Sequence, residues 1–352
     1  MSPKQKMEME QQEQPVEAIR RWYGVDVSKD SFTVALYKDL SGEMSETLEF
    51  NSNRKGVKSF LSWYGKLADP IFPSAIVMES TGCYSARLAE LMLKLDSSLY
   101  VSICNARSVS YYIKSHSANK TDKSDAKLIA RYGYDFQPQR IKVKSRDERL
   151  LRELVSERGK LVSQASALKS KDKTLEFKET KEINKKVLGF LAEQIKELEK
   201  RIEEVVRRSE EINAEIALMD SVPGIGRLSA SVIYGAFGSL KQYTRKQLSA
   251  LSGLCPKISQ SGSAPAKSTL SKTGQSYVRQ ILYLNTTQAM KKIPQLKEMR
   301  ERLLARENSC KMTARCACMR KLLLIVKGVV DSGVPYDPNY QQKKQENPSN
   351  AA

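Results

Sequence analysis

Short runs of β-branched and aromatic residues alternate with polar turn segments over the first third of the chain. Such runs occur at 22–27 (WYGVDV), 32–37 (FTVALY) and 46–50 (ETLEF), a spacing typical of an antiparallel meander. The connections then lengthen. Helical spacing is found at 55–66, 84–95, 107–115 and 122–133, and two further strands are predicted at 75–79 and 99–105. Parallel strands need helical crossovers, so the order β-β-β-α-β-α-β-α predicts one mixed sheet with helices on both faces.

The middle of the chain has a heptad pattern. Ser145–Glu148 is a capping box, and leucines follow at heptad-compatible spacing as far as Leu175. The polar stretch 178–186 (KETKEINKK) interrupts them, and a second series runs from Leu188 to Met219 with only Ser209 out of place. At about 1.5 Å per residue this second helix would be roughly 48 Å long. The pattern predicts an antiparallel coiled-coil hairpin over 145–219, which serves either as a spacer or as an oligomer interface.

The last part of the chain is mostly helical and basic. It opens with Val222-Pro-Gly-Ile-Gly226, and a Gly/Ser/Pro-rich loop at 259–266 divides its helices. Residues 1–18 and 334–352 are polar, and we expect both to be disordered tails. The expected domains are therefore an α/β domain at 19–144, the hairpin at 145–219, and a helical domain at 220–333.

Charge and composition narrow the function. There are 59 Lys and Arg residues against 40 Asp and Glu, a formal charge of +19, which favours a polyanionic partner. The longest apolar stretches, such as 322–326, are too short to span a bilayer, and the N-terminus lacks the apolar segment of an export signal. Six scattered cysteines indicate reduced thiols in a cytosol, without a zinc site. The single histidine, His116, leaves little room for histidine-based catalysis.

Four acidic residues are candidates for a metal site. Asp26 lies inside the first predicted strand, and Glu79 ends the fourth; both positions are costly for an unpaired acid. Asp122 and Asp125 stand three apart at the start of a predicted helix, so they share a face. If the first and fourth strands are neighbours, the four carboxylates meet at one end of the sheet as hard ligands for Mg²⁺, with Mn²⁺ as an alternative. Taken singly, each acid has an equally good structural explanation, as a helix cap, a first-turn acid or a turn residue.

The third domain contains a second group of candidates. The glycines Gly224 and Gly226 permit a tight turn with backbone N–H groups directed at a phosphate, as in helix-hairpin-helix modules, although an ordinary interhelical turn has the same sequence. Ser261 lies in the Gly/Ser/Pro loop close to Ser259 and Ser263, and chemistry alone does not single it out. Lys267, Lys272 and Arg279 follow it and are available to contact nucleic acid or stabilise negative charge.

These residues together resemble a known family. The strand order with Asp26, Glu79, Asp122 and Asp125 looks like the RNase H/RuvC fold with its four-acid centre. The segments GVDVSKD, MESTGCY (78–84) and KTDKSDAKLIA (120–130) are similar to the N-terminal domain of IS110/IS1111 transposases. The series LSALSGLCP (248–256), QSG (260–262), Lys272-x-Gly274 and Val278-Arg279 resembles the C-terminal domain of that family. The resemblance extends over the whole chain.

The resemblance implies a DNA recombinase of the IS110 type. It assigns the four acids to a Mg²⁺ site and Ser261 to the nucleophile that forms a serine-linked DNA intermediate. It also implies a noncoding guide RNA that pairs with donor and target DNA, a homo-oligomer (dimer or tetramer), and a prokaryotic cytoplasmic protein that associates with the nucleoid during the reaction. Delegating sequence recognition to an RNA suits a basic protein without a base-reading motif.

Three alternatives remain at this stage. A related DNA invertase would have the same residues. A RuvC-like structure-specific endonuclease would use the acids and a water nucleophile, and its cleavage would survive Ser261→Ala. A non-enzymatic nucleic-acid-binding scaffold would function without the acids, and the matching third domain argues against it most strongly.

Overall fold

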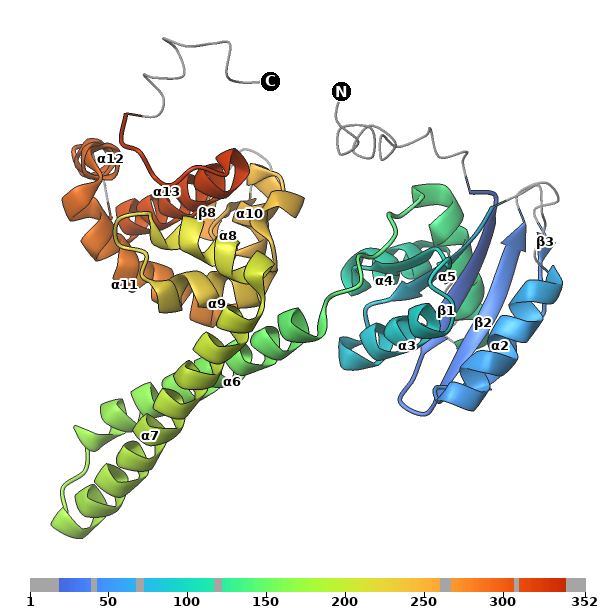
Figure 1. Ribbon diagram of the computed structural model, residues 1–352, viewed down its shortest axis with the longest axis horizontal. Coiled ribbons are helices and arrows are strands. Elements are labelled where there is room, and N and C mark those ends of the chain that lie inside the picture. The colour runs from blue at the N-terminus through green and yellow to red at the C-terminus, as the bar shows by residue number, and fades with distance from the viewer. Residues whose placement is uncertain are drawn as a thin grey trace. The chain divides into compact units, whose positions relative to one another are not determined.

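The computed structural model describes residues 19–38, 43–67, 73–116, 122–259, 267–306 and 310–339. The chain divides into two compact units between Val143 and Lys144. The first unit is the α/β part of Figure 1, and the second contains the long helices and the helical core. Within the described residues, no helix has the length and apolar character needed to cross a membrane.

A mixed sheet forms the centre of the first unit. Its strands are β1 (Arg21–Val27), β2 (Ser31–Lys38), β3 (Glu43–Met44), β4 (Leu48–Asn51), β5 (Ser74–Glu79) and β6 (Val101–Cys104). The order is β3-β2-β1-β5-β6, and β4 pairs with another part of β2. β1 is antiparallel to β2 and parallel to β5, and β5 is parallel to β6. The predicted mixed α/β class is confirmed, with β3 as an additional short strand.

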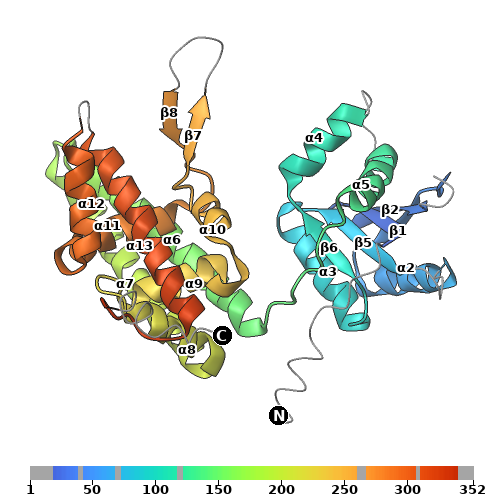
Figure 2. The same cartoon turned by 90° about the horizontal axis from the view of Figure 1, so that it is seen from above.

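Helices cover both faces of this sheet. They are α2 (Arg54–Leu67), α3 (Gly82–Leu95), α4 (Ala106–His116) and α5 (Asp122–Phe136). Alternate strand residues point to opposite faces. Tyr23 therefore packs with Phe60 of α2 and Met92 of α3, whereas Trp22 packs with Ile129 of α5 on the other side. Figures 1 and 2 show the helices on either side of the strands.

The second unit begins with two long helices packed against each other, α6 (Arg146–Asp172) and α7 (Lys178–Arg208). The capping box at Ser145 is present, with Glu148 bonding back to the Ser145 N–H. The stretch 178–186 was predicted to interrupt the helices, and this is wrong: it is the first part of α7, and the connection lies at 173–177. Lys and Glu are good helix formers, and an i,i+4 pair such as Lys178–Glu182 supports the helix despite the missing apolar stripe.

The second predicted helix begins and ends about ten residues earlier than its heptads indicate. It ends at Arg208, and Ser209 caps a new helix, α8 (Glu210–Asp220), by accepting a hydrogen bond from the Ile212 N–H. Ser209 has an extended backbone, with φ −104° and ψ 109°. Ile212, Ile216 and Met219 of α8 are buried in the core of the helical domain, so the predicted hairpin over 145–219 is too long.

The remaining helices enclose that core. They are α9 (Arg227–Phe237), α10 (Arg245–Leu251), α11 (Ser276–Lys292), α12 (Pro294–Leu304) and α13 (Lys311–Ser332). Strands β7 (Pro256–Ser259) and β8 (Lys267–Leu270) form an antiparallel hairpin on either side of the predicted loop, and neither strand was predicted. Part of the predicted C-terminal tail, residues 334–339, is ordered, because Tyr336 packs against the core and its N–H donates to Ser221 Oγ at 2.8 Å. The predicted tails at 1–18 and 340–352 lie outside the described residues.

Candidate active site

Asp26 and Glu79 lie side by side at one end of the sheet. Val25 of β1 is paired with Met78 of β5, so the next position along these parallel strands places Asp26 opposite Glu79. Alternation along each strand puts both acids on the face that Trp22 and Val77 occupy. Both acids are only partly exposed. Two carboxylates thus share one face at the carboxyl ends of two adjacent strands.

Helix α5 brings a third acid to the same end. A methyl group on Gly24 would lie 2.2 Å from the Ala126 carbonyl oxygen, and one on Gly133 would lie 2.5 Å from the Trp22 ring. Since Trp22 precedes Gly24 while Gly133 follows Ala126, α5 runs antiparallel to β1, and its first turn lies toward Asp26. Asp125 in that turn is 7% exposed.

Asp122 is the first residue of α5, and its backbone belongs to this same turn. Its side chain lies outside the described part of the structure. The short distance between α5 and β1 depends on Gly24. The sequence did not reveal this role, because a glycine within a strand can mark either a β-bulge or a place where another backbone packs closely.

The donor chemistry suits a hard divalent cation. The three described acids offer only carboxylate oxygens, the ligands that Mg²⁺ and Mn²⁺ prefer. Among the side chains that the structure describes, no group of three or more His, Cys, Asp or Glu residues could hold a metal ion. The side chain of Asp122 was not part of that search, because it is not described. Mg²⁺ retains several waters and needs only one or two carboxylates, so this arrangement fits it. Cys104 pairs with Glu79 across the sheet, but burial raises the pKa of its thiol to about 11 and keeps it neutral.

The Gly24 contact leads to a stability prediction. Gly24→Ala is expected to lower the free energy of unfolding of the first unit by about 2 kcal/mol, because the added methyl overlaps backbone atoms of α5. Gly65→Ala is the matched control, since nothing lies within 4 Å of its added methyl in α2, and it should be neutral or slightly stabilising. Urea unfolding of both variants measures the difference. Equal stabilities would mean that α5 does not pack as described.

Ser261 belongs to the second unit, between β7 and β8. It lies in segment 260–266, outside the described residues, and of Lys267 only the backbone is described. Lys272 is exposed and has a positive φ of 51°. The structure therefore locates the ends of the hairpin that carries Ser261 and gives no position for its hydroxyl.

Arg279 has a set of partners that the sequence did not indicate. Its Nη1 donates to the carbonyl oxygens of Thr273 at 3.0 Å, Ser252 at 3.3 Å and Gly274 at 3.4 Å. These bonds tie the end of α10 to the segment that follows β8. The guanidinium expected to contact nucleic acid thus holds the base of the β7–β8 hairpin.

Two glycines allow close backbone packing at the base of the β7–β8 hairpin. Gly253 has φ +69°, and a methyl there would lie 2.1 Å from the Thr273 carbonyl oxygen. Gly274 has φ +81°, and its methyl would lie 1.9 Å from the Leu251 carbonyl oxygen. Both positions need glycine for backbone conformation and for space. The hairpin consequently emerges from a tightly packed base.

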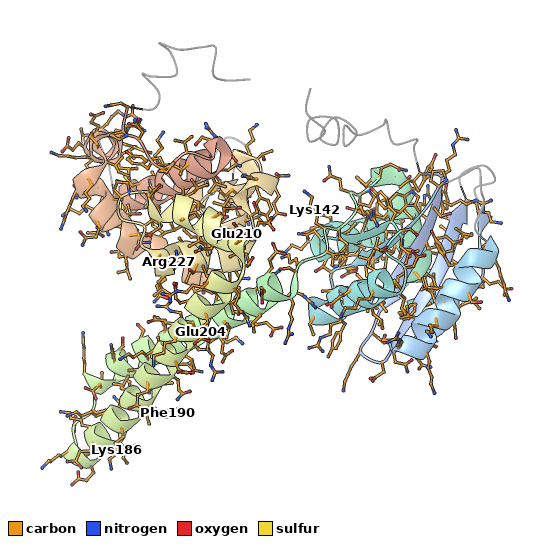
Figure 3. All side chains as sticks on the ribbon, viewed as in Figure 1. Lys142, Lys186, Phe190, Glu204, Glu210 and Arg227 are labelled. Atoms are coloured by element: carbon orange, nitrogen blue, oxygen red, sulfur yellow. The ribbon has the colours of Figure 1, made fainter. Side chains whose placement is uncertain are left out.

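The glycines of the Pro223–Gly226 turn differ from each other. Gly224 has φ +89° and packs on α11, where a methyl would lie 2.6 Å from the Ala289 N–H nitrogen. Gly226 caps α9, is exposed, and has open space around it. The next residue, Arg227, labelled in Figure 3, donates to Glu203 of α7 at 2.9 Å. Gly226 is therefore the exposed member of this pair, whereas Gly224 is only partly exposed.

Known proteins match both units. Residues 23–175 match a transposase family model of the IS110 DEDD type, and residues 216–301 match the model described as "Transposase IS116/IS110/IS902 family". The pilin gene-inverting protein of Moraxella bovis is 25% identical over 322 residues, covering 90% of this chain and 98% of the relative. That of Moraxella lacunata matches to the same extent. The transposase for insertion sequence element IS1111A of Coxiella burnetii is 26% identical over 49% of this chain and 54% of its own length.

The two family models lie where the two units carry their candidate residues. The first includes the strands and helix that hold the acids, and the second includes the β7–β8 hairpin and its base. The chain therefore belongs to the IS110 family of transposases and is a DNA transposase or recombinase.

Proposed function

We propose that the chain cleaves and rejoins DNA through a metal-dependent reaction with a serine-linked intermediate. The observation that carries this proposal is the meeting of Asp26, Glu79 and the first turn of α5 at one end of the sheet. The strand order β3-β2-β1-β5-β6, antiparallel at β1–β2 and parallel at β1–β5, supports an RNase H/RuvC-like assignment for this domain.

Each acid has a role in the proposal. Asp26, Glu79, Asp122 and Asp125 hold a divalent cation, Mg²⁺ or Mn²⁺. When bound, that cation supplies positive charge that stabilises the oxygens of the phosphodiester in displacement. The helix α5 sets the distance of Asp125 from the two strand acids, because Gly24 allows the helix backbone to rest on β1.

Ser261 is the proposed nucleophile of the second unit. Its hydroxyl loses a proton and forms an ester bond to phosphorus, and the deoxyribose oxygen leaves with a proton. A deoxyribose hydroxyl of another strand then attacks the phosphoserine ester, which rejoins the DNA and restores the serine. Lys267 and Lys272 supply positive charge to the phosphate, and Arg279 acts as a positioning residue through its bonds to the base of the hairpin.

The partners follow from the same proposal. Donor and target DNA are the substrates, a noncoding guide RNA selects the sites by base pairing, and a dimer or tetramer carries out the exchange. The exposed N-terminus of α9 at Gly226 is a proposed contact with a nucleic-acid phosphate. We place the reaction in the prokaryotic cytoplasm, at the nucleoid.

DNA inversion is the second candidate function. The alignments with the two pilin gene-inverting proteins cover 90% of this chain, whereas the alignment with the IS1111A transposase covers 49% of it. Inversion and transposition use the same strand cleavage and differ in the arrangement of the sites that are joined.

The test is a denaturing gel for a covalent protein–DNA adduct, with the full chain purified together with its bound nucleic acid. We expect labelled DNA to migrate with the protein when Mg²⁺ is present and to lose this association when EDTA removes the metal. Cleaved DNA without any adduct would indicate a water nucleophile and favour the structure-specific endonuclease.

A further inference from the structure

Four aromatic rings form a cluster between α4 and α5. We call Tyr112, His116, Tyr132 and Phe136 the α4–α5 aromatic cluster. Tyr112 and His116 have ring centroids 4.2 Å apart with their planes tilted by 30°, and Tyr132 and Phe136 stack at 4.6 Å. The two pairs meet edge to face, since Tyr112 is 5.4 Å from Tyr132 at 84° and 5.8 Å from Phe136 at 82°.

Polar contacts hold these rings in place. The Tyr112 hydroxyl donates to the Asp135 carboxylate, which fixes the ring at the centre of the cluster. His116 Nδ1 lies 2.9 Å from the Tyr112 carbonyl oxygen and 2.9 Å from Ser115 Oγ. These contacts hold Tyr112 and His116, and stacking on Tyr132 restricts the Phe136 ring, so less side-chain entropy is lost when a ligand binds.

The cluster is not a sealed core. Phe136 is 59% exposed although it carries no polar atom, and Tyr111, which precedes Tyr112 on α4, is 73% exposed. His116 is exposed as well. The stacked pair therefore ends in the exposed ring of Phe136, and the tilted pair ends in the exposed ring of His116.

The two helices that carry the cluster also carry exposed cations, Arg107 and Lys114 on α4 and Arg131 on α5. Arg131 is 49% exposed and lies 4.0 Å from Asp135, the acid that also accepts from Tyr112. A surface that binds single-stranded nucleic acid combines cations, which contact the anionic backbone, with flat aromatic rings, on which the bases stack.

We propose that the α4–α5 aromatic cluster binds single-stranded DNA by stacking an unpaired base on Phe136. Strand exchange separates DNA strands, so a DNA recombinase meets such bases during its reaction. Phe136 is eleven residues from Asp125 along α5, or about 16 Å at 1.5 Å per residue, so a strand of a few nucleotides connects the two places. The proposal rests on the chain acting on DNA and is independent of the roles of Ser261 and the acids.

The test is the affinity of the full chain for a fluorescently labelled single-stranded DNA, measured by anisotropy with EDTA present so that cleavage plays no part. Phe136→Ala is expected to weaken binding by about tenfold, and Phe136→Trp to retain it with quenching of the new indole on binding. The loss should persist at high salt, because stacking does not depend on counterion release. Arg131→Gln should weaken binding mainly at low salt.

Phe190 provides the matched control. It is also 59% exposed, but it lies on α7 of the helical hairpin (Figure 3), and Phe190→Ala should bind the DNA as the unsubstituted chain does. Equal affinities for Phe136→Ala and Phe190→Ala would overturn the proposal. A loss confined to single-stranded RNA of the same sequence, or a change in oligomeric state in place of DNA affinity, would also overturn it in favour of those partners. Circular dichroism verifies that the variants are folded.

Discussion

Ser261→Ala is expected to abolish the covalent protein–DNA adduct and to lower strand transfer by at least about 10³-fold, with DNA binding and folding unchanged. The physical reason is that alanine has no group able to form the ester with phosphorus, and a serine-linked mechanism has no substitute nucleophile at that position. The measurement is the denaturing gel described above, run with labelled DNA and Mg²⁺.

The neighbouring serines provide the control for that experiment. Ser259 ends β7 and Ser263 lies two residues beyond Ser261, so Ser259→Ala and Ser263→Ala make the same chemical change in the same hairpin. Both should retain the adduct. An adduct that survives in Ser261→Ala and disappears in one of the others would reassign the nucleophile. Cleavage without an adduct, unaffected by all three, would identify a RuvC-like hydrolase.

Asp125→Asn is expected to lower DNA cleavage by about 10³-fold, and Asp26→Asn likewise. Each replacement removes one negative charge from the site while keeping the size of the side chain. The melting temperature should rise with Mg²⁺ for the original chain and rise less for either variant.

Asp30→Asn is the matched control for the acids. Asp30 is an exposed residue of the β1–β2 turn in the same unit, so the same substitution there should change neither cleavage nor the response to Mg²⁺. If Asp125→Asn and Asp26→Asn cleave DNA normally, the acids are structural, and the proposed metal site is wrong. A variant that loses cleavage but retains the full Mg²⁺ response would place the metal elsewhere.

Local sequence patterns were sufficient to predict the positions of most strands and helices of the first unit. Runs of alternating β-branched and aromatic residues predicted strands at 22–27 and 32–37. The observed β1 begins one residue earlier, and β2 is one residue longer at each end. This worked because each strand buries side chains on the sheet, which fixes the residue types. The β7–β8 hairpin was missed, since PKIS and KSTL are short segments without a regular alternation of apolar and polar residues.

Helix ends were less predictable where charge and apolar spacing disagreed. Heptad spacing continues through Ser209, yet Ser209 ends one helix and caps the next. Conversely, 178–186 lacks a regular apolar stripe and is helical. Apolar spacing records which face is buried, whereas the cap and the helix-forming tendency of Lys and Glu decide where a helix starts and ends.

The sequence by itself determined the residue types of the site, the order of the elements and, through its motifs, the family. Asp26, Glu79, Asp122 and Asp125 are visible as acids in places where acids are costly or paired. Only the tertiary structure decided that β1 lies beside β5 and that α5 packs antiparallel to β1 on Gly24. It likewise decided that the Arg279 guanidinium donates hydrogen bonds to three backbone carbonyl oxygens. Residue types reflect local burial and chemistry, whereas these neighbours depend on register and packing between segments far apart in the chain, which no local pattern encodes.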